Sequence, residues 1–289
     1  MGFSLLELTV KSRRGRMLAR YVASTRLGHS FVRRRFARNY YKTNLSLIRA
    51  WSKLWTENAN FYYKLSPKNR MELVSMASVV VGVTIEEAEK YLIELDLNDS
   101  LRNHIAAAWA GNPKMRDAQV AYGRREGWYV FIRAMKPRVV VETGVHDGVG
   151  ACVIAAALME NSKEGFLGRY FGTDIDSEAG SLFTAPFNEV GEILYGDSIL
   201  SLTKMNGMID LFINDSDHSA EYERAEYRAI SNKLAANSLV LGDNSHLTSE
   251  LNIWARSRSR PYLLFREEPI NHWYPGAGIG ISPSSIPLL

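Results

Sequence analysis

Asp215, Asp217 and His218 crowd into four positions of the segment INDSDHS, which spans residues 213–219. They directly follow the apolar run MIDLF, whose composition predicts a buried strand. Ligands of α/β proteins bind beside the carboxyl ends of such strands. These side chains could therefore bind a metal ion, move a proton, or simply form a solvated turn, with Asp217 as the cap of the helix that follows.

A glycine-containing loop follows an earlier apolar run, in the segment VVVETGVHDGVG at residues 139–150. Gly144 and Gly148 stand in the predicted turn from strand to helix, where glycine permits a tight turn and close approach of a ligand to the backbone. The spacing is neither G-x-G-x-x-G nor the G-K-[ST] of a P-loop. The loop alone is weak evidence, because any turn of this kind can require glycine.

Polar residues also follow the next two predicted strands. Asp174 ends the segment RYFGTD, in the place where an acid binds ribose hydroxyls in dinucleotide folds, and Asp176 could equally cap the next helix. Asp197 and Ser198 follow EILYG, near where an adenine ring would lie. Three strand ends with polar groups together are stronger evidence for a nucleotide site than any one of them.

The elements that must position these residues alternate along the chain. We expect a helix over GWYVFIRAM, which Lys136-Pro137 ends, and a strand over RVVVETGV. Alternating strands and helices predict an α/β, Rossmann-like, doubly wound and mostly parallel sheet. Two terminal strands, PYLLFRE and IGIS, should form an antiparallel hairpin. The remaining predicted elements are strands at 169–175, 191–195, 208–214 and 238–242 and helices at 150–160, 220–235 and 247–257.

We expect residues 1–115 to form a helical N-terminal region and residues 116–289 to form a second domain that contains the predicted sheet. Ser66-Pro67 and Thr84, with Glu87 three positions later, are typical helix starts. Residues 1–60 form a basic arm with thirteen Lys and Arg against the two acids Glu7 and Glu57, in a chain of net charge +4. The arm could meet an anionic membrane, nucleic acid or an acidic partner, or mediate homo-oligomerisation, although a solvated helical face is the preferred interpretation.

The composition is that of an ordinary globular protein, with 46% hydrophobic and 23% charged residues. The single cysteine, Cys152, excludes a disulfide framework and favours a reducing compartment. No apolar run approaches the ~20 residues that span a bilayer. The short apolar stretch at the N-terminus precedes its basic cluster, the reverse of a secretory signal. We therefore expect a cytoplasmic protein.

The segments ETGVHDG, TDID, YGDS, DLFINDSDH and LVLGDN together resemble a class I S-adenosylmethionine-dependent methyltransferase. The chain is most similar to small-molecule O-methyltransferases of the catechol, caffeoyl-CoA and macrocin type, over residues 118–289. The terminal hairpin agrees, because the seventh strand of this family is antiparallel. The resemblance implies that the following residues bind the cofactor: Glu142, Gly144, Gly148, Asp174, Asp197 and Ser198.

The resemblance also implies a metal site. In metal-dependent members an Asp after the fourth strand and an Asp-Asn pair after the fifth bind a divalent cation, and here these positions are Asp215, Asp243 and Asn244. Such oxygen ligands suit Mg²⁺, which would lower the pKa of an acceptor hydroxyl. Asp243-Asn244 is also ordinary turn chemistry. Catechol-type enzymes have a lysine base at the position of His218, whereas macrocin-like enzymes have a histidine there. The imidazole of His218 can accept a proton near neutral pH.

The preferred prediction is thus O-methylation of a small molecule such as a sugar or glycosylated metabolite, with His218 and Asp215 as catalytic residues and Mg²⁺ as a second cofactor. One alternative is an NAD-dependent oxidoreductase on the same sheet, although the glycine spacing and terminal hairpin weigh against it. Another is a non-catalytic protein that binds nucleic acid or a membrane through the basic arm. The proposed ligand set fits small hydroxylated acceptors better than nucleic acid.

Overall fold

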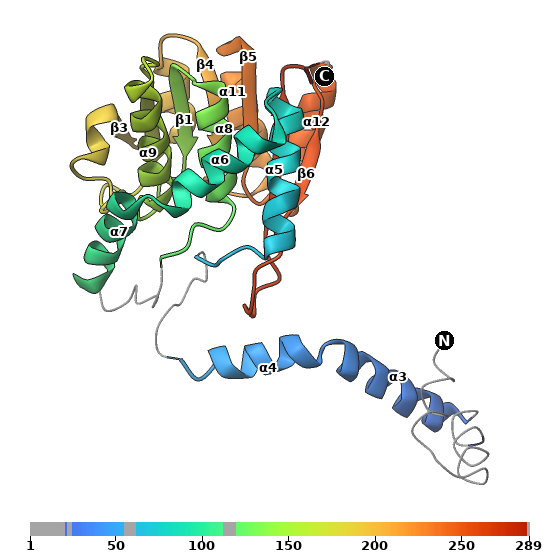
Figure 1. Ribbon diagram of the computed structural model, residues 1–289. Coiled ribbons are helices and arrows are strands. Elements are labelled where there is room, and N and C mark those ends of the chain that lie inside the picture. Colours follow the sequence, from blue (N-terminus) through green and yellow to red (C-terminus); the bar gives the residue numbers. More distant parts are fainter. Residues whose placement is uncertain (1–20, 22–24, 55–61, 112–119, 288–289) are drawn as a thin grey trace. The chain divides into compact units, whose positions relative to one another are not determined.

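The computed structural model describes residue 21 and residues 25–54, 62–111 and 120–287 (Figure 1). The chain divides into two compact units. The first comprises Met1–Trp55 with Asn271–Trp273, and the second comprises Thr56–Ile270 with Tyr274–Leu289. In the described part of the first unit, α3 (Arg26–Tyr40) and α4 (Lys42–Trp51) follow one another, and Thr25 caps α3 by accepting a hydrogen bond from Gly28 N at 3.0 Å.

A seven-stranded sheet forms the centre of the second unit, in the order β3-β2-β1-β4-β5-β7-β6. Neighbours from β3 to β5 are parallel, whereas β7 is antiparallel to both β5 and β6. The predicted mostly parallel sheet with an antiparallel terminal pair is confirmed. The strands are β1 (Val139–Thr143), β2 (Arg169–Asp174), β3 (Gly191–Tyr195), β4 (Ile209–Asn214), β5 (Leu234–Gly242), β6 (Leu263–Arg266) and β7 (Gly278–Pro283).

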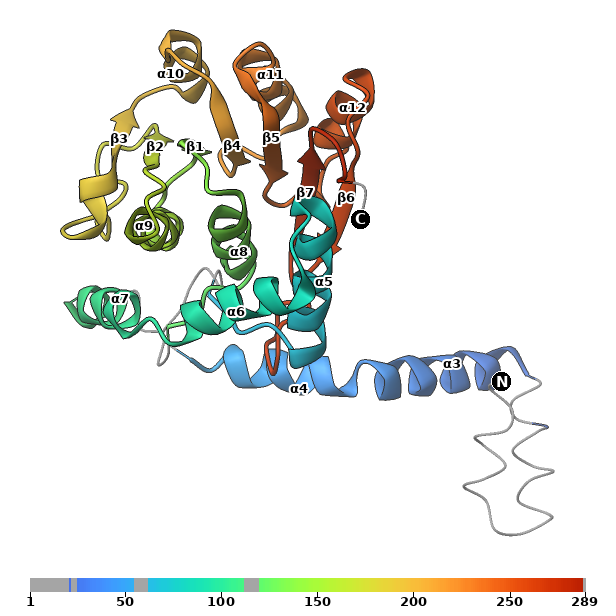
Figure 2. The same ribbon diagram turned by 45° about the horizontal axis from the view of Figure 1, so that its top comes forward.

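Helices cover both faces of this sheet (Figure 2). On one face lie α8 (Arg125–Met135) and α9 (Val149–Lys163), and on the other α10 (Ser198–Lys204), α11 (Ala220–Ile230) and α12 (Glu250–Ser257). Outside α8 and α9 pack α5 (Pro67–Val81), α6 (Ile85–Asp96) and α7 (Asp99–Gly111), and a 3-10 turn, Phe187–Val190, lies beside α9. The N-terminal helices α5 to α7 thus support the sheet from behind its first helical layer.

Apolar residues alternate between two cores because successive side chains of a strand point to opposite faces. Val140 and Leu211 pack into the larger core toward α8 and α9, whereas Val141, Phe212 and Val240 pack toward α11 and α12. Since both faces are covered, the strands read as continuous apolar runs rather than alternating patterns. Helices on both faces therefore hold the strands whose carboxyl ends form this edge of the sheet.

Several predicted details differ from the structure. The segment GWYVFIRAM does form a helix. Its sequence pattern is amphipathic, but residues 125–133 are all buried, because α5 and α6 cover the side that would otherwise face solvent. β5 begins at Leu234 rather than 238, and α11 ends at Ile230 rather than 235. The predicted caps are confirmed, since Ser66 accepts from Asn69 N at 3.2 Å and Thr84 from Glu87 N at 3.1 Å.

The helices between residues 67 and 111 belong to the same compact unit as the sheet. The predicted boundary between a helical N-terminal region and a second domain, near residue 115, therefore lies within the second compact unit, and the separate function of residues 1–115 stays a prediction. None of the helices in the described ranges has the length and apolarity that crossing a membrane requires.

Candidate active site

A cavity of about 640 Å³ opens at the carboxyl ends of β1 to β5. It lies where the strand order reverses between β1 and β4, the usual ligand position in doubly wound sheets. Of the predicted site residues, seven line it: Gly144, Asp174, Asp197, Ser198, Asp215, His218 and Asn244. Glu142, Gly148 and Asp243 do not. Separate strand ends therefore bring together most, but not all, of the predicted site.

Gly144 is required by its surroundings. Its φ is +82°, and a Cβ at this position would collide with the carbonyl group of Asp215. The backbone after β1 therefore lies directly against the backbone after β4, which joins the predicted cofactor loop to the predicted catalytic segment. Gly148 has a φ of +100° and lies against Gly180, so it permits the start of α9 rather than forming cavity wall.

Glu142 points away from the cavity, into the core beneath α9. It is 1% exposed, and Tyr170 Oη donates to its Oε2 at 2.5 Å. A Cβ on Gly150 of α9 would meet its Oε1. Burial raises the pKa of Glu142 to about 8, although the Tyr170 hydrogen bond opposes this shift. The structure therefore places this residue as a support of the loop, not on the surface where the predicted cofactor would lie.

Asp174 lines the cavity, but its carboxylate already braces the glycine loop. Oδ2 accepts from Val145 N at 3.0 Å and His146 N at 2.9 Å, and Oδ1 accepts from Asp176 N at 2.9 Å. Exposed Ile175 and Asp176 follow it along the cavity wall. Oδ1 accepts from one donor only, so Asp174 can order the loop and still accept from a ligand hydroxyl through Oδ1.

Glu226 on α11 is a buried acceptor that ties several strand ends together. It accepts from Ser198 Oγ and Asn214 Nδ2, from Ser216 Oγ at 2.8 Å and from Thr143 Oγ1 at 3.2 Å. The hydroxyl of the predicted cofactor residue Ser198 is thus already engaged. Asp197 caps α10 by accepting from Leu200 N at 2.8 Å, and its second oxygen, Oδ2, accepts from Tyr222 Oη at 3.4 Å.

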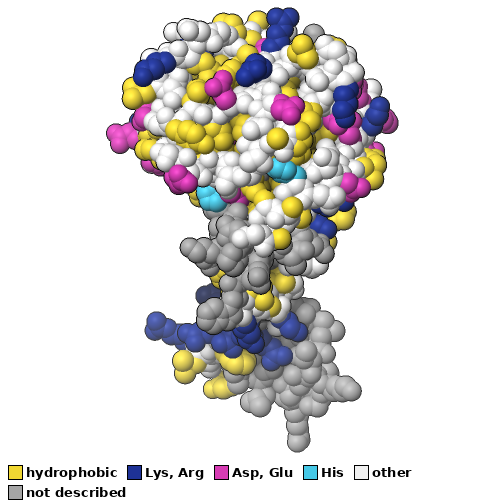
Figure 3. Space-filling view, turned by 90° about the vertical axis from the view of Figure 1, so that its left-hand side faces the viewer, with side chains coloured by type: hydrophobic (Ala, Val, Ile, Leu, Met, Phe, Trp, Pro, Cys, Tyr) yellow, Lys and Arg dark blue, Asp and Glu magenta, His cyan; other side chains and the backbone are white. Residues whose placement is uncertain are grey.

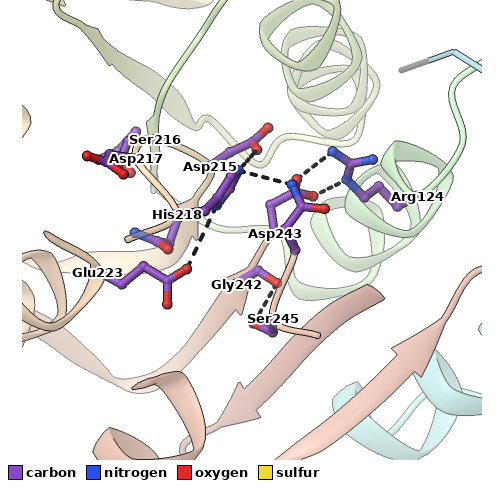
Figure 4. Close-up of polar contacts among 12 residues, drawn as sticks. Arg124, Asp215, Ser216, Asp217, His218, Glu223, Gly242, Asp243 and Ser245 are labelled. Atoms are coloured by element: carbon purple, nitrogen blue, oxygen red, sulfur yellow. Dashed lines mark hydrogen bonds and ion pairs between the residues drawn. The ribbon is translucent and has the colours of Figure 1, made fainter. Parts of the chain in front are cut away.

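His218 lies between two carboxylates (Figure 4). Its Nε2 is 3.7 Å from Asp215 Oδ1, and its Nδ1 is 3.8 Å from Glu223 Oε1. The side-chain nitrogen of Asn244 lies 3.0 Å from Nε2. The predicted helix cap is wrong in detail: Ser219, not Asp217, caps α11 by accepting from Tyr222 N, while Asp217 accepts from Ser219 N at 2.8 Å.

Arg124 directly precedes α8 and makes a bidentate ion pair with Asp243 through Nε and Nη2 (Figure 4). Both residues are buried, at 3% and 1% exposed. The third nitrogen, Nη1, lies 3.8 Å from Glu267 Oε2. The neighbouring Arg125 places Nη2 3.8 Å from Asp215 Oδ2. Two guanidinium groups therefore enter the acidic cluster that the sequence pattern assigned to a metal ion.

These contacts change the protonation of the two aspartates. Burial raises the pKa of Asp215 well above its usual range, and neighbouring Asp243 raises it further. Burial would also raise the pKa of Asp243, but the Arg124 guanidinium outweighs burial and lowers it. The pKa values of the two aspartates are therefore shifted in opposite directions.

The fit of a divalent cation to this cluster is mixed. Asp215, His218 and Asp243 each offer one ligand atom, and the three atoms lie within 4.8 Å of one another. However, Arg124 engages both oxygens of Asp243, and the Asn244 side chain faces His218 rather than this group. The predicted set of Asp215, Asp243 and Asn244 therefore does not fit an ion in this arrangement.

The residues that sequence reasoning missed are mainly buried charges: Arg124, Arg125, Glu223 and Glu226. The segment YGRREG and the helix AEYERAEYRAI read as ordinary charged surface. The one available signal is that Arg124 and Arg125 directly precede a strongly apolar helix, where a charge must find a partner once buried.

One family model and several solved structures are similar to this chain. Residues 141–245 match the family model described as a methyltransferase domain. No curated protein sequence matches the chain. Among solved structures, TomG, an O-methyltransferase from Streptomyces achromogenes involved in tomaymycin synthesis, is 13% identical, with a TM-score of 0.48 and 64% and 89% of the two chains covered. An O-methyltransferase from Bacillus cereus has a TM-score of 0.47 at 13% identity, covering 73% of this chain and 96% of its own.

The family match begins in β1 and ends just after β5, and so contains every strand whose carboxyl end contributes to the cavity. It favours the methyltransferase prediction over the NAD-dependent oxidoreductase. Residues 141–245 are thus similar to a methyltransferase domain, in agreement with the resemblance seen in the sequence.

Proposed function

We propose that this enzyme methylates a hydroxyl oxygen of a small molecule, with His218 as the base and a sugar or glycosylated metabolite as the preferred acceptor. The observation that carries the proposal is the position of His218. Its ring lines the same cavity as Gly144 and Asp174, and it follows the carboxyl end of β4, whereas the predicted ribose acid ends β2. A base and a nucleotide-binding edge therefore share one cavity of a volume usual for small-molecule sites.

Polar and apolar groups suited to S-adenosylmethionine surround this cavity. Asp174 and Asp176 offer oxygens to ribose hydroxyls, and the side chain of Ile175, 82% exposed, offers an apolar surface for a purine ring. Asp197 lies beside the same region. When bound, S-adenosylmethionine supplies an electrophilic methyl group on a positively charged sulfur, which the negative charge of this wall favours.

Arg125 extends the assignment to the methionine end. The residue is 8% exposed, and its Nε and Nη1 have no hydrogen-bond partner within the described ranges. Its guanidinium carbon lies 5.6 Å from the ring centroid of Tyr62 and 5.3 Å from that of Trp128, which fixes its direction. Planar guanidinium groups bind carboxylates through paired hydrogen bonds. We assign the two free nitrogens to the carboxylate of the methionine moiety.

His218 is oriented to accept a proton at Nε2. The Asn244 amide donates toward Nε2, which leaves the proton of the neutral ring on Nδ1, facing Glu223. An acceptor hydroxyl that replaces the Asn244 amide would pass its proton to Nε2. Its oxygen would form a bond to the methyl carbon as the sulfur–methyl bond breaks. No part of this route uses Mg²⁺.

The test is methyl transfer with isotopically labelled S-adenosylmethionine and a panel of sugars and glycosylated metabolites, followed by mass spectrometry. His218→Ala should reduce turnover by roughly 10²–10⁴-fold, the range of general-base catalysis. Binding of S-adenosylhomocysteine, measured by calorimetry, should stay unchanged. His246→Ala is the matched control, because His246 does not line the cavity. Unchanged turnover in His218→Ala would refute the assignment of the base.

The basic helices suggest a second, peripheral role. Residues 25–54 contain eight Lys and Arg and no acid, and Figure 3 shows such side chains beside exposed hydrophobic ones where α3 and α4 lie. This charge supports contact with an anionic membrane, or with a partner subunit in a homo-oligomer. Co-sedimentation with phosphatidylserine vesicles, compared between the wild type and Arg33→Gln/Arg34→Gln/Arg35→Gln, tests the first contact, and analytical ultracentrifugation the second.

A further inference from the structure

Asp243 lies at the end of β5, behind the cavity rather than on its wall. Arg124 Nη2 donates to Asp243 Oδ2 at 2.5 Å, and Nε donates to Oδ1. The side chains of Arg124 and Asp243 are 4% and 0% exposed, so the pair is almost completely buried, with Arg124 between Asp243 and the cavity that it lines. A divalent ion that binds Asp243 would have to displace this buried guanidinium group from both carboxylate oxygens.

Charge in this cluster is balanced without a metal. Arg124 and Arg125 provide two permanent positive charges, because arginine does not deprotonate in proteins. Asp215 and Asp243 face them, with Arg125 Nη2 3.8 Å from Asp215 Oδ2. A divalent cation would add two positive charges beside both guanidinium groups in a poorly hydrated region, where repulsion between like charges is strong.

The remaining predicted ligand is also engaged. Asn244 has a φ of +54°, a left-handed conformation that asparagine tolerates, and its side-chain nitrogen faces His218 Nε2 at 3.0 Å. The nitrogen of this amide is therefore directed at His218.

We propose that Arg124 is a built-in cation that replaces the divalent ion, so that this enzyme binds no Mg²⁺ at Asp215 and Asp243 and transfers methyl groups without metal. The inference deepens the proposed function. Only the statement that methyl transfer needs no metal rests on that function. Arg124 fixes Asp243, Arg125 places its Nη2 3.8 Å from Asp215 Oδ2, and Asp215 Oδ1 lies 3.7 Å from His218 Nε2. The guanidinium thereby performs the structural part of a metal's role, which is to hold the acidic strand ends together.

The experiment is calorimetric titration of the full chain with MgCl₂ and MnCl₂, together with thermal unfolding in the presence of each salt or of EDTA. The wild type should give no binding heat at millimolar metal and no metal-dependent shift of Tm. Arg124→Gln removes the internal cation and leaves two carboxylates, so Mn²⁺ should raise its Tm. The additional change Asp243→Asn should abolish that shift.

Arg133→Gln is the matched control. Arg133 is a buried arginine paired with Glu94 and Glu164 far from the cavity, so its loss should lower Tm without creating a metal response. Wild-type binding of Mg²⁺ tighter than about 1 mM that is lost in Asp243→Asn would overturn the proposal. If Arg124→Gln does not fold, the metal titrations of the wild type and of Asp243→Asn test the proposal by themselves.

These readouts separate the two proposals. A wild type that binds S-adenosylhomocysteine but shows no metal response supports the internal cation whether or not the acceptor is a sugar. Methyl transfer that stops with EDTA and returns with Mg²⁺ contradicts it while leaving the methyltransferase assignment intact. Failure of S-adenosylhomocysteine binding would remove the proposed function without touching the metal titration.

Discussion

Glu223 Oε1 lies 3.8 Å from His218 Nδ1, and in the described part of the chain neither atom has a hydrogen-bond partner. Glu223 is 1% exposed and also accepts from Thr248 Oγ1, which directs its carboxylate. A buried carboxylate at this distance from the outer nitrogen of a histidine favours a proton on that nitrogen and stabilises the imidazolium that forms on proton transfer. Glu223 is therefore a positioning residue for the proposed base.

Glu223→Ala should lower kcat by roughly tenfold or more, and by less than His218→Ala, because the base remains but loses its orientation. KM for the acceptor and the Kd of S-adenosylhomocysteine should change little. Glu223→Gln should recover part of the loss, since its amide oxygen can still accept from Nδ1–H. Steady-state kinetics distinguishes this from a structural role, which would change KM and kcat together and gain nothing from the glutamine.

Arg125→Gln should weaken S-adenosylhomocysteine binding roughly tenfold or more, the worth of hydrogen bonds to a charged group. The prediction is specific to one end of the ligand. Calorimetry with 5′-methylthioadenosine, which lacks the amino-acid carboxylate, should give the same Kd for the wild type and the variant. Equal losses for both ligands would show that Arg125 supports the cavity rather than binding the carboxylate.

Glu226→Ala should destabilise the fold by about 3 kcal/mol or more, since it leaves the buried donors of Ser198, Asn214, Ser216 and Thr143 without their acceptor. Glu226→Gln should cost less, because one oxygen remains. Urea unfolding measures both. Asp210→Ala is a useful comparison, as Asp210 accepts two backbone hydrogen bonds at the opposite end of the sheet. If all three variants lost a similar free energy of unfolding, the role of Glu226 as a shared acceptor for several buried donors would be contradicted.

Glu142 should make stability depend on pH. Its folded-state pKa of about 8 lies above that of an unfolded glutamate, so the folded chain holds a proton that the unfolded chain releases. Its contribution to stability is complete below pH ~4.5 and is lost as the pH rises toward 8, by up to about 1.4 kcal/mol per pH unit. Glu142→Gln should flatten this slope in urea unfolding at pH 5.5 and 7.5. An unchanged slope would show that Glu142 is not its source.

The order of elements and most of the cavity wall were predictable from the sequence. Apolar runs, caps such as Thr84, and polar residues after strands are local signals, and parallel strands necessarily bring their carboxyl ends to one edge. For that reason Gly144, Asp174, Asp197, Asp215 and His218 were found together at the cavity, as expected. The mostly parallel sheet with its antiparallel terminal strands follows from the same local information.

Only the tertiary structure decided which charges face one another. Arg124 and Asp243 are 119 positions apart, and their pairing depends on how α8 packs against the end of β5. Glu142 turns inward because alternate residues of β1 face opposite sides, so an acid one position before Thr143 falls beneath α9. Burial then turns these placements into chemistry, since a buried charge must find a partner or give up its ionisation, and neither outcome is written in the local sequence.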